Sequence, residues 1–105
     1  MEISIPPEYL EFIALHGAVE SFTEGEPGYV ALWLPQDVAG NNKDIQIAEL
    51  APGYLAFAGD GGGEILAFNS KGEVFMLPLI GMEARYAQKI ANNWSEFSES
   101  IELPS

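Results

Sequence analysis

The chain has 105 residues, about the length of one domain, and 48% of them are hydrophobic, which is enough to build a core. Sixteen acidic residues against four basic ones give a net charge of -12, which repels phosphate backbones, so we expect no nucleic-acid partner. The absence of cysteine excludes disulfides, zinc–thiolate sites and thiol catalysis.

The sequence lacks the segments that direct proteins into or across membranes. Its start has neither the basic residues nor the apolar run of a signal peptide. No stretch approaches the roughly 20 apolar residues of a membrane span. We therefore expect a soluble, cytoplasmic protein without membrane contact. Because there is no internal repeat and no linker, residues 1–105 are expected to form a single domain, whose oligomeric state the sequence leaves open.

The first expected element is a short helix between Pro6 and Gly17. Pro6 and Pro7 suit a first helical turn, where their missing N–H groups would be unpaired anyway. Gly17 is a suitable C-cap, and His16 beside it is well placed against the helix dipole. Because His16 is the only histidine, this structural role is the expected one.

The middle of the chain predicts one strand followed by irregular segments. Residues 29–34 are apolar at both alternating sets of positions, which favours a strand covered on both faces, and Pro35 ends it. We expect one helical turn at 35–38 and a polar turn at 39–44. Residues 45–47 alternate briefly, as in a weak edge strand.

The second half predicts a meander followed by a helix. Residues 54–58, 65–68 and 74–77 are apolar and are separated by turn sequences, which indicates three antiparallel strands. Apolar residues then recur at helical spacing, namely Ala87, Ile90, Ala91, Trp94, Phe97 and Ile101, so we expect a helix packed on the sheet, with Trp94 and Phe97 in the core. Together these elements predict an α+β fold with a mainly antiparallel sheet of about four to six strands, flanked by an N-terminal and a C-terminal helix.

The loop at residues 59–64 invites three interpretations. Glycines let backbone N–H groups approach an anion, and Asp60 with Glu64 could hold a cation. However, a phosphate loop precedes a helix, whereas Glu64 leads into a strand, and a calcium loop needs more oxygen ligands. We therefore expect a glycine-dependent turn, with partner recognition as the alternative.

Catalytic machinery is not evident in the sequence. It has no cysteine, and no serine lies in a nucleophile elbow. Asp60 and Glu64 could form an acid/base pair, but spacing in the sequence does not establish the separation that such a pair needs. We expect no catalytic residue, no metal and no cofactor.

Acidic residues are concentrated in the first half of the chain. Glu20, Glu24 and Glu26 precede the first expected strand, and Asp37, Asp44 and Glu49 follow it. A solvated face explains such acids. The self-repulsion of a small domain with this charge would be offset by a basic partner, so a binding surface is the alternative explanation.

Four segments resemble the SUKH superfamily, the Smi/Knr-type domain family. They are residues 5–12 followed by His16-Gly17, the run Leu-Trp-Leu-Pro-Gln-Asp-Val at 32–38, residues 54–64, and the closing Ile-Ala-Asn-Asn-Trp-Ser-Glu-Phe at 90–97. Their order extends over nearly the whole chain. His16 and Ala18 depart from the Asn and Gly that are common in the family, and Glu64 departs from its usual loop pattern.

The resemblance implies an α+β binding domain without a catalytic set. Most bacterial members are thought to be immunity proteins that neutralise a toxin, often a nuclease, whereas eukaryotic members are linked to cell-wall regulation and signalling. We expect occlusion of a basic toxin's active site; a regulatory adaptor and a carboxylate-based enzyme acting on a glycan or nucleotide are the alternatives. The expected partner contacts are Glu20, Glu24, Glu26, Trp33, Asp37, Asp60 and Glu64.

Overall fold

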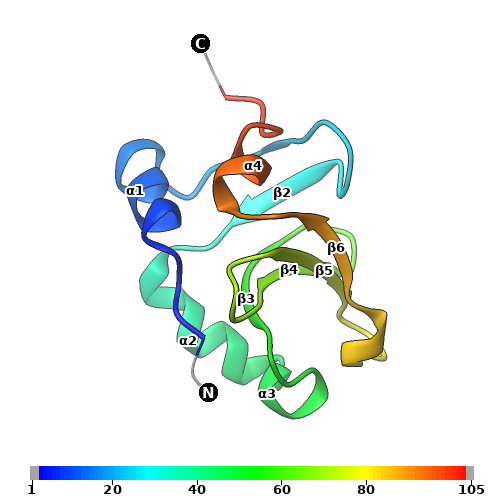
Figure 1. Ribbon diagram of the computed structural model, residues 1–105. Coiled ribbons are helices and arrows are strands. Elements are labelled where there is room, and N and C mark those ends of the chain that lie inside the picture. Colours follow the sequence, from blue (N-terminus) through cyan, green and yellow to red (C-terminus); the bar gives the residue numbers. More distant parts are fainter. Residues whose placement is uncertain (1–2, 104–105) are drawn as a thin grey trace.

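A computed structural model describes residues 3–103 and shows six strands in one curled antiparallel sheet (Figure 1). Each strand pairs with the next one in sequence, which confirms the predicted α+β fold and its central meander. The strands are β1 (Glu20–Phe22), β2 (Tyr29–Leu32), β3 (Leu55–Gly59), β4 (Glu64–Phe68), β5 (Val74–Pro78) and β6 (Gln88–Ala91).

Helices lie on both sides of this sheet. They are α1 (Pro7–His16), α2 (Pro35–Asp44), α3 (Ile47–Leu50), the 3-10 turn η1 (Ala84–Tyr86) and α4 (Trp94–Ser98). Helices α1 and α4 lie next to each other near β2, whereas α2 and α3 lie together near the start of β3 (Figure 1). None of the helices in residues 3–103 has the length and apolar character needed to cross a membrane.

The two faces of the sheet carry two hydrophobic clusters. The larger one joins α1 and α4 to the sheet through aromatic rings: Tyr9 lies 4.8 Å from Trp94 between ring centroids, and Phe57 stacks on Phe68 at 4.1 Å. Trp94 and Phe97 are each 3% exposed, so the prediction that they belong to the core is confirmed. The smaller cluster comprises Ile47, Ala51, Ala56, Ile65, Ala67, Leu77 and Met82.

Strand β2 is covered less evenly than its sequence predicted. Val30 and Leu32 are buried in the larger cluster, whereas Tyr29 and Ala31 are only half-buried on the other face. Alternation places Trp33 on the same side as Tyr29 and Ala31, and its ring packs at the edge of the smaller cluster. One face of β2 therefore stays accessible near its start.

The prediction for residues 39–47 was wrong. Helix α2 continues through the polar residues to Asp44, and residues 45–47 form no strand: Gln46 is left-handed (φ 58) and Ile47 begins α3. The helix persists because Asn42 is buried and anchors it to β3. Its Nδ2 donates to the Val38 and Ala56 carbonyls at 2.7 and 2.8 Å, and its Oδ1 accepts from the Ala56 N–H at 2.7 Å.

The predicted C-terminal helix is much shorter than expected. Residues 88–91 form β6, paired with β5 in the register Met76↔Gln88 and Phe75↔Lys89, and only residues 94–98 are α-helical. Asn93 separates the two elements, because its Oδ1 accepts from the Glu96 N–H at 2.8 Å and caps the new helix. Ala91 and Trp94 are both buried at helix-like spacing, but a strand and a helix supply them.

A further difference is β1, which lies in a segment expected to be a loop. It pairs with β2 through Glu20↔Ala31, Ser21↔Val30 and Phe22↔Tyr29. The chain after α4 covers its outer edge: the Glu102 N–H donates to the Phe22 carbonyl at 2.9 Å, and Ser21 Oγ donates to the Glu102 carbonyl. A partner remote in sequence therefore helps to hold this short strand.

Candidate functional site

Acidic and aromatic side chains gather where the β1–β2 hairpin meets the β3–β4 loop. Tyr29 links the two, because its hydroxyl donates to Glu20 Oε1 at 3.0 Å and its ring borders Gly61. A Cβ at Gly61 would lie 3.6 Å from that ring, and the residue has φ 77, so glycine suits this approach. We call this region the acidic corner and define it as Glu20, Phe22, Glu26, Tyr29, Asp60 and Glu64.

The hairpin loop that carries Glu24 and Glu26 is held by Thr23 and Gly28. The Thr23 N–H donates to the Gly28 carbonyl at 3.0 Å, and the Gly28 N–H donates to Thr23 Oγ1 at 2.8 Å. The Glu24 N–H also donates to the Ser100 carbonyl at 2.9 Å. Both carboxylates therefore extend from a backbone fixed at its two ends.

Asp60 organises the loop at residues 59–64. Its Oδ1 accepts from the Gly62 N–H at 2.7 Å and from the Glu64 N–H at 3.0 Å. Gly61 and Gly63 both have positive φ, so the predicted glycine-dependent turn between two strands is confirmed. One carboxylate oxygen of Asp60 is thereby occupied by the backbone.

Like charges and partial burial shift pKa values in the acidic corner. Burial raises the pKa of the Glu64 carboxyl above its usual value, and the negative charges of Asp60 and Glu26 raise it further. The hydrogen bond to Glu20 raises the pKa of the Tyr29 hydroxyl. A cationic group placed here would relieve this repulsion, so the arrangement favours basic ligands. Among residues 3–103, no three potential metal ligands come together.

Opposite pKa shifts at Glu64 and Glu73 predict opposite pH dependences. The pKa of Glu73 is lowered, first by the hydrogen bond from Lys89 and then by that from Asn69. Glu73 therefore stabilises the fold at neutral pH and loses this effect as the pH falls, whereas Glu64 opposes folding increasingly as the pH rises. From about pH 3 to about pH 7, we expect Glu64→Gln to gain stability relative to the wild type and Glu73→Gln to lose it.

Urea denaturation of the wild type and both variants across this range tests the prediction. Each glutamine variant is the control for the other, because both remove one carboxylate from the same protein. Parallel stability curves for Glu64→Gln and Glu73→Gln would contradict the assigned shifts.

An aromatic pair, with Phe22 exposed and Tyr29 half-buried, lies within the acidic corner. The rings of Phe22 and Tyr29 meet edge to face at 5.8 Å, and Phe22 is 64% exposed. Aromatic side chains of this kind carry much of the binding energy in protein interfaces. Sequence reasoning missed Phe22 and Tyr29 as site residues; the alternation of Glu20 and Phe22 was the available indication, and it lay in a segment expected to be a loop.

The other expected contact residues lie apart from the corner. Trp33 follows the opposite end of β2 from Tyr29 and is half-buried against the smaller cluster. Asp37 is exposed in the first turn of α2, beyond Trp33. The structure thus brings together Glu20, Glu26, Asp60 and Glu64, and it does not place Trp33 or Asp37 with them.

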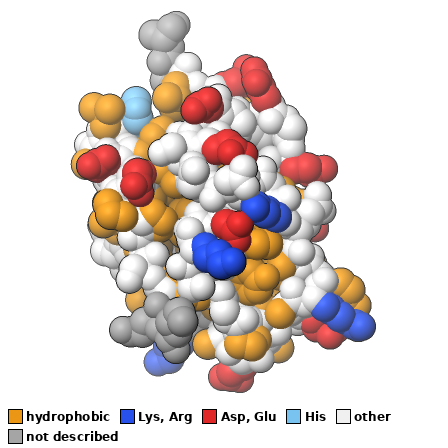
Figure 2. Space-filling view, in the orientation of Figure 1, with side chains coloured by type: hydrophobic (Ala, Val, Ile, Leu, Met, Phe, Trp, Pro, Cys, Tyr) orange, Lys and Arg blue, Asp and Glu red, His pale blue; other side chains and the backbone are white. Residues whose placement is uncertain are grey.

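Glu24 and Glu26 line a cavity of about 370 Å³ between the hairpin, β6 and α4. We call it the seam cavity; its other lining residues include Lys89, Ile90, Glu96 and Phe97. Figure 2 shows acidic side chains and no Lys or Arg in the upper part of the view, where α4 and the hairpin lie; the basic side chains lie from the middle downward. Charge is therefore segregated toward this end of the molecule.

The sequence model of the SMI1 / KNR4 family (SUKH-1) matches residues 1–100. This chain belongs to that family. The resemblance carried by the four sequence segments is thereby confirmed. No curated protein sequence matches the chain.

Proposed function

We propose that this SUKH-1 domain is a non-catalytic binding protein, and that it acts as an immunity protein by occluding the active site of a basic toxin. The observation that carries the proposal is the acidic corner, where the exposed Phe22 ring and the half-buried Tyr29 ring lie among four carboxylates. Family membership supports a protein-binding role. A cytoplasmic location and a single domain over residues 1–105 belong to the same proposal.

Electrostatics gives the proposal a physical basis. A nuclease toxin must present cationic surface to bind phosphate, and a blocker with a net charge of -12 would be steered toward that surface. Opposite charges would speed association, while the aromatic pair would supply apolar contact area after docking. Such an inhibitor needs no chemistry of its own.

An enzyme that uses Asp60 and Glu64 is the second candidate, and the raised pKa of Glu64 is the observation in its favour. A raised carboxyl pKa suits a general acid. Against this role, one carboxylate oxygen of Asp60 already accepts hydrogen bonds from the Gly62 and Glu64 N–H groups. A pH–rate profile abolished by Asp60→Asn would be its minimum support. A regulatory adaptor remains the third candidate and differs only in the identity of the bound protein.

A tagged pull-down from lysate of the source organism, eluted with increasing salt and read by mass spectrometry, tests the proposal. We expect capture of a basic toxin domain, followed by inhibition of its activity in vitro. Capture of a cell-wall or signalling protein instead would favour the adaptor.

Charge reversal at the corner then tests the binding surface. Glu26→Lys combined with Glu64→Lys should lower the association rate with the captured partner by about tenfold or more and weaken its salt dependence. Asp60→Asn is preferable to a lysine at that position, because it retains an oxygen acceptor for the turn. The matched control is Glu11→Lys with Glu49→Lys, two exposed helical acids outside the corner. Equal rates for both double variants would exclude the corner as the contact surface.

A further inference from the structure

The two edges of the sheet differ in whether another segment of the chain covers them. The outer edge of β1 is covered by residues 100–102, which form a bridge between Thr23 and Ile101 and two backbone hydrogen bonds beside it. Among the described strands, β6 pairs only with β5. Within residues 3–103, no backbone hydrogen bond joins β6 to any other segment. Strand β6 therefore presents unpaired backbone groups along its outer edge.

This open edge borders the seam cavity. Ile90 of β6 and Phe97 of α4 supply apolar lining, and Glu24 and Glu26 line the cavity from the hairpin. A volume of about 370 Å³ would hold about a dozen water molecules at roughly 30 Å³ each, which leaves room for a long side chain.

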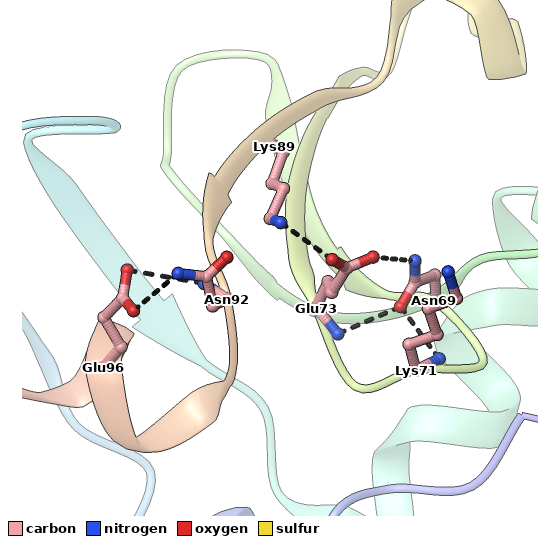
Figure 3. Close-up of polar contacts among 6 residues, drawn as sticks. All are labelled: Asn69, Lys71, Glu73, Lys89, Asn92 and Glu96. Carbon is pink, nitrogen blue, oxygen red and sulfur yellow. Dashed lines mark hydrogen bonds and ion pairs between the residues drawn. The ribbon is translucent and has the colours of Figure 1, made fainter.

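The charges that line the cavity favour a cation. Its basic residue, Lys89, is engaged by Glu73 at 2.7 Å, and Figure 3 shows this pair beside the Asn69 side chain. Glu96 lies on the other side of β6, where its carboxylate accepts from Asn92 Nδ2 at 3.0 Å and is thereby held in place. Lys89 is already neutralised by Glu73, so the three cavity carboxylates, Glu24, Glu26 and Glu96, leave an excess of negative charge.

We propose that β6 is a docking edge for an extended basic segment of a partner protein, which adds to the sheet as a further strand and places a Lys or Arg side chain in the seam cavity. Backbone hydrogen bonds to β6 would hold the segment, as in other cases of strand addition. The aliphatic stem of the basic side chain would lie on Ile90 and Phe97, while its charged end would reach the carboxylates. This inference rests on the proposed binding function and specifies the form of the partner.

The bulge in β6 limits where the added strand can pair. The register with β5 shifts between Val74↔Ala91 and Phe75↔Lys89, which leaves Ile90 as the extra residue. Bulges and lysines on edge strands discourage indiscriminate pairing. We therefore expect the edge to accept a segment that also satisfies the cavity, and to reject apolar strands that lack a basic residue.

A blocked peptide of alternating valine and arginine is the probe, titrated into the isotope-labelled full chain and followed by NMR. We expect amide shifts centred on residues 88–91, together with slower hydrogen exchange there. The same peptide with alternate backbone nitrogens methylated keeps its charge but cannot pair, so its affinity should fall at least about tenfold. A peptide with citrulline in place of arginine should also bind more weakly.

Variants of the protein locate the basic side chain. Glu24→Gln combined with Glu96→Gln should lower the affinity for the arginine peptide by about tenfold. The control, Glu11→Gln combined with Glu49→Gln, removes the same charge elsewhere and should change this affinity little. Equal binding of the methylated peptide, shifts confined to the acidic corner, or no shift up to about 1 mM peptide would overturn the inference. The proposed function would survive each of these results if binding of the captured partner still depends on Glu64, which belongs to the acidic corner and not to the lining of the seam cavity.

Discussion

Asn42→Ala is expected to lower the free energy of unfolding by about 3 kcal/mol, since it leaves buried backbone groups without partners. The Asn42 side chain is 8% exposed and satisfies both the N–H and the carbonyl of Ala56 in β3. Alanine cannot replace these bonds. Loss of the anchor should also loosen the C-terminal half of α2, whose sequence is polar.

Urea denaturation measures this loss, and Asn41→Ala is the matched control. Asn41 precedes Asn42 in the same helix, and within the described residues 3–103 its side chain forms no hydrogen bond. The control should therefore change stability by less than about 0.5 kcal/mol. If both alanine variants unfold at the same urea concentration, the buried amide does not hold α2 to the sheet.

Tyr9→Ala is expected to cost about 3 to 5 kcal/mol, the range for removal of a large buried side chain. Tyr9 is fully buried, and its ring meets Phe57, Phe68 and Trp94 at centroid distances of 5.3, 5.9 and 4.8 Å. These edge-to-face contacts join α1 to the sheet and to α4. Tyr9→Phe keeps the ring but removes the hydroxyl that donates to the Trp33 carbonyl at 2.6 Å. Because this carbonyl is left without its partner, the substitution should lower the free energy of unfolding by about 1 to 2 kcal/mol.

The same hydroxyl predicts a dependence on alkaline pH. Burial raises the pKa of Tyr9 well above its usual range, although the bond to Trp33 opposes this shift. Because the unfolded chain releases this proton more readily, the wild type should lose stability above about pH 10. Tyr9→Phe should lose less over this interval. Urea denaturation of both proteins at neutral and alkaline pH measures this difference in stability. An equal loss of unfolding free energy with pH in the two proteins would contradict the effect of burial.

Hydrogen bonding distinguishes the acids of this part of the fold from one another. Asp60 and Glu96 each accept hydrogen bonds from nearby backbone or amide groups, whereas within residues 3–103 the Glu26 carboxylate forms no hydrogen bond or ion pair. Charge reversal at Glu26 therefore tests binding with the least disturbance of the fold. The salt dependence of association is the informative readout, because structural damage alone would not remove it.

Local patterns predicted those elements whose partners are close in sequence. Helix α1 is bounded by Pro7 and by Gly17, whose positive φ ends it, and strands β3 to β5 are joined by short turns. In each case, the residues at the ends of the element also stabilise its conformation. The glycine-rich turn at 59–64 follows the same logic, since Asp60 and the glycines act within the loop.

Patterns failed where a distant partner decides the conformation. The polar residues of α2 predict a turn, but they form a helix because Asn42 bonds to Ala56 in β3. The spacing of residues 88–91 predicts a helix, but they form a strand because they pair with β5. Apolar spacing of three and four residues does not distinguish one helix from a strand followed by a capped turn. The missed strand β1 depends on β2 and on residues 100–102.

The sequence by itself determined the charge of the protein, the absence of thiol chemistry, the antiparallel meander and the family, because composition and local turns carry that information. Only the tertiary structure decided which acids meet. It separated Trp33 and Asp37 from Glu26, Asp60 and Glu64, and it added Phe22 and Tyr29 to them. The reason is that cross-strand register and the curl of the sheet, rather than spacing along the chain, set which side chains become neighbours.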